Sequence, residues 1–196
     1  MAELSFCHYL YLKKEGIKMN YATIKTHDVA NGPGVRVSLF VSGCTHHCKN
    51  CFNKETWDFN FGEPFDENVQ NTILEALSPS FIAGFSLLGG EPMHPDNQSA
   101  VLEISKKVKE KYPEKNIWCY SGYLYEDILE GKVGDKETAN DLLKCIDILV
   151  DGKFVEELKN PGLQFRGSSN QRIIDVQKSL EKGEICIWDE LTDRIN

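Results

Sequence analysis

The chain has 196 residues, of which 41% are hydrophobic and 27% are charged, a composition typical of one ordinary globular domain. The formal net charge of −8 disfavours a general nucleic-acid-binding protein, because such proteins usually present a basic face. No apolar stretch approaches the roughly 20 residues that span a bilayer, and residues 1–18 lack the cleavage pattern of a signal peptide. We therefore expect a cytoplasmic protein that binds neither nucleic acid nor a membrane.

Strand and helix patterns alternate along the chain. The apolar, β-branched run over 35–41 follows a glycine-rich turn at 31–34 and predicts the first clear strand. Apolar residues at helical spacing predict a helix over 66–77. The further elements predicted, in chain order, are a strand over 82–88, a helix over 98–111 capped by Asp96 or Asn97, a strand over 116–120, helices within 124–130 and 137–146, a strand over 147–150 and a fifth strand within 172–176. This alternation predicts an α/β fold with mainly parallel strands.

Four loops with polar or reactive residues each follow a predicted strand. They are the cysteine-rich loop over 42–53, the turn Gly89-Gly90-Glu91, the pair Ser121-Gly122 and the triplet Asp151-Gly152-Lys153. If the strands are parallel, their carboxyl ends lie at one edge of the sheet, where open α/β sheets bind ligands. We therefore expect one functional site at that edge.

Three of the seven cysteines lie within eight residues and form the pattern C-x3-C-x2-C at Cys44, Cys48 and Cys51. An odd number of cysteines without a secretory signal argues against a disulfide framework. Cysteine thiolates hold iron–sulfur clusters, and three close cysteines can bind three irons of a [4Fe-4S] cluster. The fourth iron then stays open for a ligand that is not protein.

The spacing of these cysteines leaves two structural alternatives open. A zinc ion could take the three thiolates together with His46 or His47. A closed cluster of the ferredoxin type could take a fourth cysteine, with Cys119 as the candidate. By default we expect the two histidines to be solvated loop residues and Cys119 to be part of the core.

The turn Gly89-Gly90-Glu91-Pro92 follows the second predicted strand. Glycines at a strand end let a ligand approach the backbone closely, because they carry no Cβ. Backbone carbonyls exposed there can accept hydrogen bonds from an ammonium group of a ligand. A tight structural turn would have the same sequence. The cysteine loop, one strand–helix unit earlier in the chain, favours the ligand-binding interpretation.

Together, the cysteine loop and the Gly-Gly-Glu-Pro turn resemble the radical S-adenosylmethionine (SAM) superfamily. The segment NGPGVR over 31–36 resembles activating enzymes of glycyl-radical enzymes. The stretches LFVSGCTHHCKNCFNKETWDF, IWCYSGY, ILVDGKF and FRGSSNQR are most similar to activating proteins of anaerobic ribonucleoside-triphosphate reductase. The resemblance covers about 19–172 and implies a partial (β/α) barrel. It divides the chain into an N-terminal extension over 1–18, a radical SAM domain over 19–175 and a C-terminal tail over 176–196.

The resemblance also implies which residues bind the cofactors. SAM would chelate the open iron of the cluster through its amino and carboxylate groups. The residues implied are Cys44, Cys48 and Cys51 for the [4Fe-4S] cluster, Gly89, Gly90 and Glu91 for the methionine end of SAM, and the backbone of Asn50, Cys51 and Phe52 for its adenine. Many members of the superfamily carry an aromatic residue just before the last cysteine. Here that position is Asn50, and the aromatic residue is Phe52. The side-chain contact with adenine therefore differs from the one that those members make.

The chemistry implied by the resemblance starts with a reduced cluster, which gives one electron to SAM. The C–S bond of the sulfonium breaks, and the resulting 5′-deoxyadenosyl radical takes a hydrogen atom from a glycine of the partner. The implied partner is anaerobic ribonucleoside-triphosphate reductase, and a flavodoxin-like or other low-potential donor would supply the electron. The alternatives are an activator of another glycyl-radical enzyme, a plain iron–sulfur electron carrier and a zinc-binding module.

Four further residues have both a functional and a structural interpretation. Arg36 and Arg166 either contact SAM or the partner, or are ordinary solvated surface residues. Asp151 and Lys153 either lie near SAM at the end of the fourth predicted strand or form a structural turn.

Overall fold

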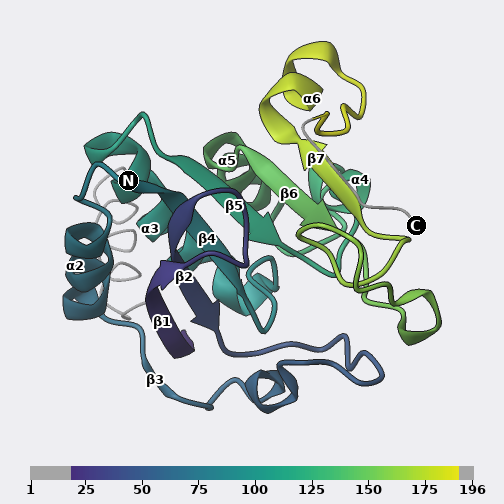
Figure 1. Ribbon diagram of the computed structural model, residues 1–196, viewed down its shortest axis with the longest axis horizontal. Helices are drawn as coiled ribbons and strands as arrows, with labels where there is room; N and C mark the ends of the chain where they lie inside the picture. The colour runs from purple at the N-terminus through teal and green to yellow at the C-terminus, as the bar shows by residue number, and fades with distance from the viewer. Residues whose placement is uncertain (1–18, 190–196) are drawn as a thin grey trace, which may run out of the picture.

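The computed structural model describes residues 19–189, so the predicted N-terminal extension over 1–18 and the last residues, 190–196, lie outside the described part. One seven-stranded sheet forms the centre of the molecule (Figure 1). Its strands are β1 (Asn20–Asp28), β2 (Val35–Val41), β3 (Glu63–Pro64), β4 (Ile82–Gly89), β5 (Asn116–Tyr120), β6 (Ile148–Asp151) and β7 (Arg172–Asp175). The helices are α2 (Glu67–Ala76), α3 (Pro95–Lys111), α4 (Tyr125–Leu129), α5 (Lys136–Cys145) and α6 (Val176–Lys182), with short 3-10 turns η1 (Lys54–Trp57) and η2 (Glu156–Leu158).

The sheet is parallel at its centre and antiparallel at both sides. Its order is β3-β1-β2-β4-β5-β6-β7. β2, β4, β5 and β6 run parallel to one another, whereas β1, β3 and β7 pair antiparallel with their neighbours. The outer strands β3 and β7 do not pair with each other in the described part, so the sheet is open. The predicted α/β class with parallel strands is confirmed for the four central strands.

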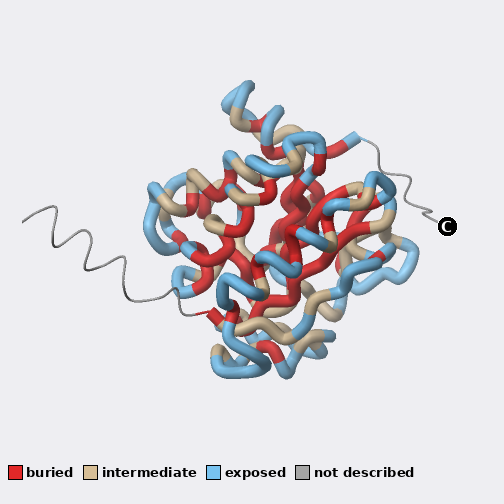
Figure 2. Tube along the Cα trace, turned by 90° about the vertical axis from the view of Figure 1, so that its left-hand side faces the viewer, coloured by how far each residue is buried: buried red, intermediate tan, exposed pale blue. Residues whose placement is uncertain are grey.

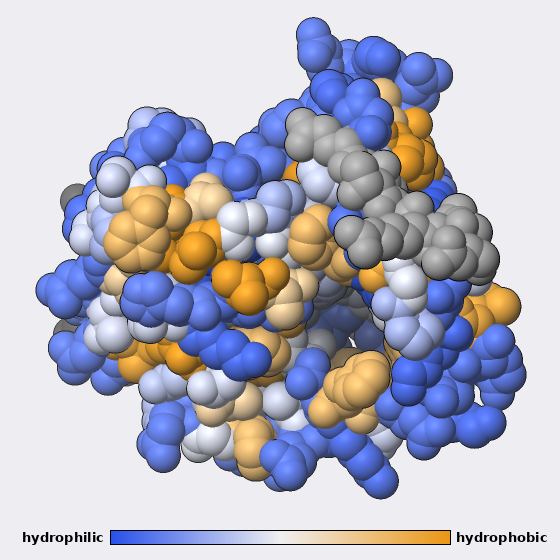
Figure 3. Space-filling view, in the orientation of Figure 1, coloured by the Kyte–Doolittle hydropathy of each residue, from blue (hydrophilic) through white to orange (hydrophobic). Residues whose placement is uncertain are grey.

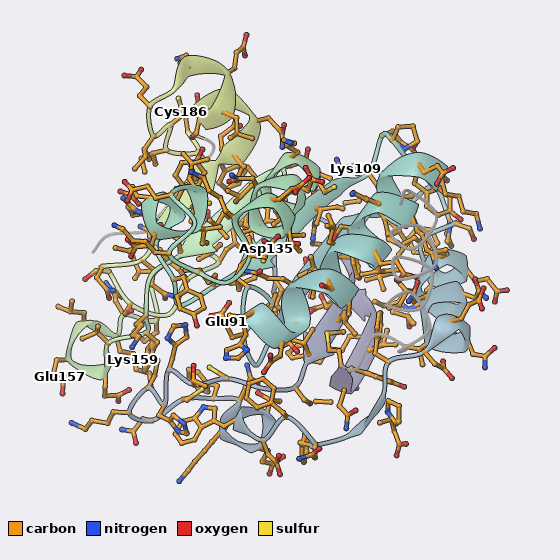
Figure 4. The ribbon with its side chains drawn as sticks, turned by 180° about the vertical axis from the view of Figure 1, so that it is seen from behind. Glu91, Lys109, Asp135, Glu157, Lys159 and Cys186 are labelled. Carbon is orange, nitrogen blue, oxygen red and sulfur yellow. The ribbon has the colours of Figure 1, made fainter. Side chains whose placement is uncertain are left out.

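Side chains of the central strands alternate between two apolar layers. On one face, Leu39, Leu87 and Leu149 pack in the main core with helix residues such as Ile104 and Leu142. Seen from behind, the helices cover this face (Figure 4). The opposite face contributes Trp118, Ile148, Val150 and Ile173 to a second, smaller cluster. Buried segments therefore run through the middle of the molecule, and exposed loops surround them (Figure 2).

Most predicted elements are present, but β1 and the two-residue β3 were missed and one helix start was wrong. β1 has exposed Lys25, Thr26 and His27 in its second half, so the sequence shows no apolar run there. The helix predicted from 98 begins at Pro95, and its N-cap is His94, whose Nδ1 accepts from the Asp96 N–H at 3.2 Å. Proline suits this first helical position because its missing N–H would have no partner inside the helix.

The segment after β7 packs back onto the sheet. α6 ends at Gly183, whose φ of 68° is a left-handed conformation that glycine adopts without strain. Ile187 then forms an antiparallel bridge with Ile174, and the buried Trp188 ring lies 5.1 Å from that of Trp118. Up to this point the predicted C-terminal tail is therefore part of the packed structure. No helix in the described part of the chain is long and apolar enough to cross a membrane.

Candidate functional site

A cavity of about 580 Å³ lies at the carboxyl ends of β2, β4, β5 and β6. The molecular surface is hollowed between the strand ends and the loops that follow them (Figure 3). Its walls include Cys44, His46, Cys48, Cys51, Phe52, Trp57, Gly89, Gly90, Glu91, Tyr120, Ser121, Gly122, Gly152 and Phe154. The four loops that the sequence predicted to share one sheet edge therefore line the same cavity.

The three clustered cysteines all face this cavity as free thiols. Cys44 is buried, while Cys48 and Cys51 are half-buried. Burial raises the pKa of the Cys44 thiol to about 11, and the nearby Glu91 carboxylate adds to this effect. Burial and the neighbouring Cys51 also raise the pKa of Cys48. Iron binds thiolates, so the positive charge of bound iron would offset the repulsion among the three sulfurs.

The start and the end of the cysteine loop are fixed by backbone hydrogen bonds. The Gly43 N–H donates to the Thr56 carbonyl at 2.8 Å, and the Cys44 N–H donates to the Trp57 carbonyl at 3.1 Å. Both acceptors belong to η1, directly after the loop. The chain between these two points is therefore a closed loop that presents all three thiols on one side.

The three cysteines line one cavity. Among residues 19–189, no three His, Cys, Asp or Glu side chains are grouped to hold a single metal ion. A zinc ion would require thiolates about 2.3 Å from one centre, whereas a four-iron cluster spreads its cysteine ligands over a larger body. The three thiols are the donors that a four-iron cluster with one open iron requires.

The other ligand candidates lie elsewhere or have other partners. Cys119 is fully buried in the main core and does not line the cavity, so the structure does not favour a closed cluster through this residue. The His47 ring packs against Trp57 at 4.6 Å between ring centres. His46 was expected to be solvated, and this was wrong: its side chain is only 7% exposed and contacts Glu91.

The Glu91 carboxylate is buried and fully hydrogen-bonded. Its Oε1 accepts from the Met93 N–H at 2.9 Å and from the Ser121 hydroxyl at 2.8 Å. Its Oε2 accepts from the Gly122 N–H at 2.7 Å and from His46 Nε2 at 2.9 Å. Four donors therefore surround a side chain that is 1% exposed, and Figure 4 shows Glu91 between the strand ends and the cysteine loop. The carboxylate joins three of the loops that line the cavity.

Asn97, in the first turn of α3, makes a similar connection that sequence reasoning missed. Its buried Nδ2 donates to the carbonyl oxygens of Ser42 and Glu91, both at 3.0 Å. One side-chain amide thus holds the start of the cysteine loop beside the Gly-Gly-Glu turn. The sequence suggested Asn97 only as a helix cap, because a capping residue and a loop-binding residue look the same there.

The two glycines of the turn are required by packing within the protein. A Cβ on Gly90 would lie 2.7 Å from the Gly43 carbonyl oxygen and 3.0 Å from that of Thr56. Gly89 has a φ of 106° and would place a Cβ 2.8 Å from the backbone of Phe40 and Val41. The cysteine loop therefore lies directly against the turn, and the backbone of both glycines lines the cavity.

The backbone conformation explains why Asn50 precedes the last cysteine. Asn50 has a φ of 56°, a left-handed conformation that Asn tolerates better than an aromatic residue does. Phe52 stands at the cavity wall, 79% exposed, with Lys159 over its ring at 5.1 Å. Lys159 and Glu157 lie on the loop after β6 (Figure 4), and Glu157 pairs with Lys49 of the cysteine loop at 3.0 Å.

Of the remaining candidates, Arg36 and Asp151 have structural partners, whereas Lys153 lies next to the site. Arg36 is fully buried and does not line the cavity; its Nε donates to the Ser86 hydroxyl at 2.7 Å, so it is not a surface residue. Asp151 is also fully buried and is bound by Arg172. Lys153 lines an adjoining pocket with Thr45 and Tyr123. Neither the burial of Arg36 nor the pairing of Asp151 leaves a local signal in the sequence.

One polar group in the cavity wall lacks a partner. The Tyr120 hydroxyl is buried and has no hydrogen-bond partner among residues 19–189, and Tyr120 lines the cavity. A buried hydroxyl without a partner is costly unless a ligand or water satisfies it. The three thiols, the glycine turn and this hydroxyl together fit a site for an iron–sulfur cluster and a polar organic ligand.

The comparison with known proteins agrees with this donor set. A family model described as a 4Fe-4S single cluster domain matches residues 30–174, a range that contains the cavity loops. The site and this match together define the class of protein: it has a domain for a single [4Fe-4S] cluster.

Similar proteins narrow the class. Anaerobic ribonucleoside-triphosphate reductase-activating proteins from Vibrio cholerae and Escherichia coli K12 are 45% and 41% identical over 157 and 155 residues, which is 79% and 78% of this chain and 97% and 96% of those proteins. The protein of that name from Enterobacteria phage T4 is 40% identical over 155 residues, 79% of this chain and 93% of that protein. The chain belongs to the family of anaerobic ribonucleoside-triphosphate reductase-activating proteins.

Proposed function

We propose that this protein is a radical SAM activating enzyme that generates a glycyl radical on anaerobic ribonucleoside-triphosphate reductase. The observation that carries the proposal is the cavity in which three free cysteines, a Gly-Gly-Glu turn and an unpartnered tyrosine hydroxyl meet. Family membership, with similar proteins matched over nearly their whole length, supports the same reductase as the partner. We further infer that the open sheet corresponds to the partial (β/α) barrel of radical SAM proteins.

Each part of the site has a task in this proposal. Cys44, Cys48 and Cys51 hold the [4Fe-4S] cluster and leave one iron for the amino and carboxylate groups of SAM. When bound, the cluster supplies one electron to the SAM sulfonium, whose C–S bond breaks to give methionine and a carbon radical that removes a hydrogen atom from the partner's glycine. The protein provides position and excludes water, and it needs no general base or nucleophile.

Different parts of the cavity wall face the two ends of SAM. The backbone of Gly89 and Gly90 faces the methionine end, where its carbonyl groups accept from the SAM ammonium group. The backbone over Asn50, Cys51 and Phe52 faces the adenine. The Glu91 side chain takes part indirectly, because all four of its hydrogen bonds are made to protein donors.

The activation reaction can be tested by electron paramagnetic resonance. Reduced, cluster-loaded protein is mixed with SAM and the anaerobic reductase from the same source. A glycyl doublet is expected on the reductase, and it should be absent without SAM and with the Cys48→Ala variant. A radical that forms only with a different glycyl-radical enzyme would overturn the partner assignment. If an intact cluster never cleaves SAM under strong reduction, the enzyme assignment is overturned and the electron-carrier alternative gains support.

The electron donor is a separate part of the proposal. SAM cleavage needs a potential at the low end of the range of about −700 to +450 mV that iron–sulfur clusters cover. We propose a flavodoxin-like or other low-potential donor in the cytoplasm. Reduced flavodoxin should then replace a chemical reductant in the assay, whereas a donor of higher potential should not.

A further inference from the structure

His46 lies in the cysteine loop, two residues after Cys44, yet it is bound by a different loop. Its Nε2 lies 2.9 Å from Glu91 Oε2, and the exposed fractions of the two side chains are 7% and 1%. A carboxylate only accepts hydrogen bonds, so Nε2 is the donor in this contact. A charge-assisted hydrogen bond between buried groups is stronger than a neutral one at the surface.

The surrounding residues form a niche for the His46 imidazole. Its ring lies 4.4 Å from that of Tyr123, centre to centre, in an edge arrangement. A Cβ on Gly122 would lie 2.4 Å from His46 Cδ2 and 2.5 Å from its Nε2. The absence of a side chain at residue 122 therefore leaves room for the imidazole beside Glu91.

The Glu91 carboxylate is already held in place without His46. Met93 and Gly122 donate backbone N–H groups to it, and Ser121 donates its hydroxyl. These three donors belong to the Gly-Gly-Glu turn and to the loop after β5. Among the described residues, His46 is the one side chain of the cysteine loop with a hydrogen bond to the carboxylate. The Glu91 contact thus acts on the loop that carries the three thiols.

We infer that His46 is a positioning residue that fixes the cysteine loop on the Gly-Gly-Glu turn. This inference rests on the proposed function, in which the cysteine loop holds the cluster and the turn holds the methionine end of SAM. The distance between the open iron and SAM depends on how these two loops sit against each other. Through Glu91, His46 holds one loop against the other and so keeps that distance constant.

The neighbouring His47 provides a matched control. It lies directly before Cys48, in the same loop, but its ring packs against Trp57 and it does not line the cavity. Its φ is 49°, so His47→Asn keeps a residue that tolerates the left-handed conformation. At residue 46, His46→Leu removes the donor and keeps much of the volume, and His46→Gln retains an N–H donor of similar reach.

The test measures SAM binding to anaerobically reconstituted proteins with known iron and sulfide content. Dissociation constants come from equilibrium dialysis, and the spectrum of the reduced cluster is recorded by electron paramagnetic resonance with and without SAM. We expect His46→Leu to bind SAM at least about tenfold more weakly, as is typical when a residue that orients metal ligands is lost. The SAM-induced change in its spectrum should shrink. His46→Gln should restore both properties, and His47→Asn should match the wild type.

The possible outcomes separate this inference from the proposed function. If the wild-type spectrum responds to SAM and His46→Leu responds equally, with unchanged affinity, His46 does not position the loop. If His46→Leu and His46→Gln both lose the cluster while their metal-free forms melt like the wild type, His46 acts on cluster retention and the inference is overturned. If the wild-type protein carries a cluster that never responds to SAM, the proposed function fails, and the inference fails with it.

Discussion

Arg172 donates two hydrogen bonds to the carboxylate of Asp151, one from Nε at 2.9 Å and one from a terminal nitrogen. Asp151 ends β6, Arg172 begins β7, and the two residues are paired in the antiparallel register. The same guanidinium group binds both carboxylate oxygens of Glu126, at 2.9 and 2.6 Å. The pair therefore connects the last parallel strand, the antiparallel edge strand and α4.

Replacing Arg172 with Met should destabilise the fold, because it leaves the fully buried Asp151 carboxylate without its cation. Breaking a buried ion pair costs about 3–5 kcal/mol, and the partial exposure of Arg172 places the expected loss near the lower value. Urea unfolding of Arg172→Met and of the wild type measures this loss in the free energy of unfolding. Glu126→Gln is the matched control and should cost less than about 1 kcal/mol, since solvent screens this more exposed pair. Equal losses of stability in the two variants would contradict the assignment of the larger contribution to the buried pair of Arg172 and Asp151.

The contribution of Glu126 should depend on pH. Its hydrogen bonds with Arg172 lower the pKa of Glu126 below its usual 4.5. A carboxyl group whose pKa is lower in the folded state stabilises the fold above its unfolded pKa, and this stabilisation is lost as the pH falls through the folded pKa. The stability difference between wild type and Glu126→Gln should therefore be present at pH 7 and shrink below pH 4.5. If this stability difference instead grew as the pH fell, the prediction would be wrong.

Cluster loading should require the three clustered cysteines and tolerate the loss of Cys119. Cys44→Ala, Cys48→Ala and Cys51→Ala should each abolish the visible absorbance and labile sulfide of anaerobically reconstituted protein. Cys119→Ala should retain both, because Cys119 lies in the core outside the cavity. Loss of the cluster in Cys119→Ala with retention in Cys48→Ala would show that the ligands are assigned wrongly.

Substitution of Asn50 tests the left-handed turn before the last cysteine. Asn50→Phe restores the aromatic residue found in many radical SAM proteins but forces it to a φ of 56°. The strain is roughly 1–2 kcal/mol, so the melting temperature should fall and the cluster should be lost faster. Asn50→Gly relieves the strain and should keep the cluster. A stable, SAM-binding Asn50→Phe protein would mean that the turn adapts easily.

The sequence predicted the central strands and the shared cavity of the four loops because both have strong local signals. The run over 35–41 is β2 residue for residue, and 116–120 is β5. β1 was missed because exposed polar residues occupy its second half, and its pairing with β2 depends on contacts that no local pattern contains. Antiparallel strands with one solvated face are generally harder to detect than buried parallel strands.

Burial was the least predictable property of the site. His46 and His47 are adjacent and chemically identical, yet one is bound by Glu91 and the other packs on Trp57. Arg36 looked like a surface residue, but its side chain is buried, with the guanidinium carbon 5.7 Å from the centre of the Trp118 ring. These outcomes are decided by residues that are distant in sequence, such as Glu91 for His46 and Ser86 for Arg36.

The anchoring of the cysteine loop has a consequence for what happens when the metal is lost. Its ends are fixed by Thr56 and Trp57, and Asn97 binds the carbonyl of Ser42 at its start, all through protein hydrogen bonds. Small metal domains often fold only when the ion arrives. Here each of these anchoring hydrogen bonds joins two atoms of the protein itself. We therefore expect the chain to stay folded when oxidation removes the cluster.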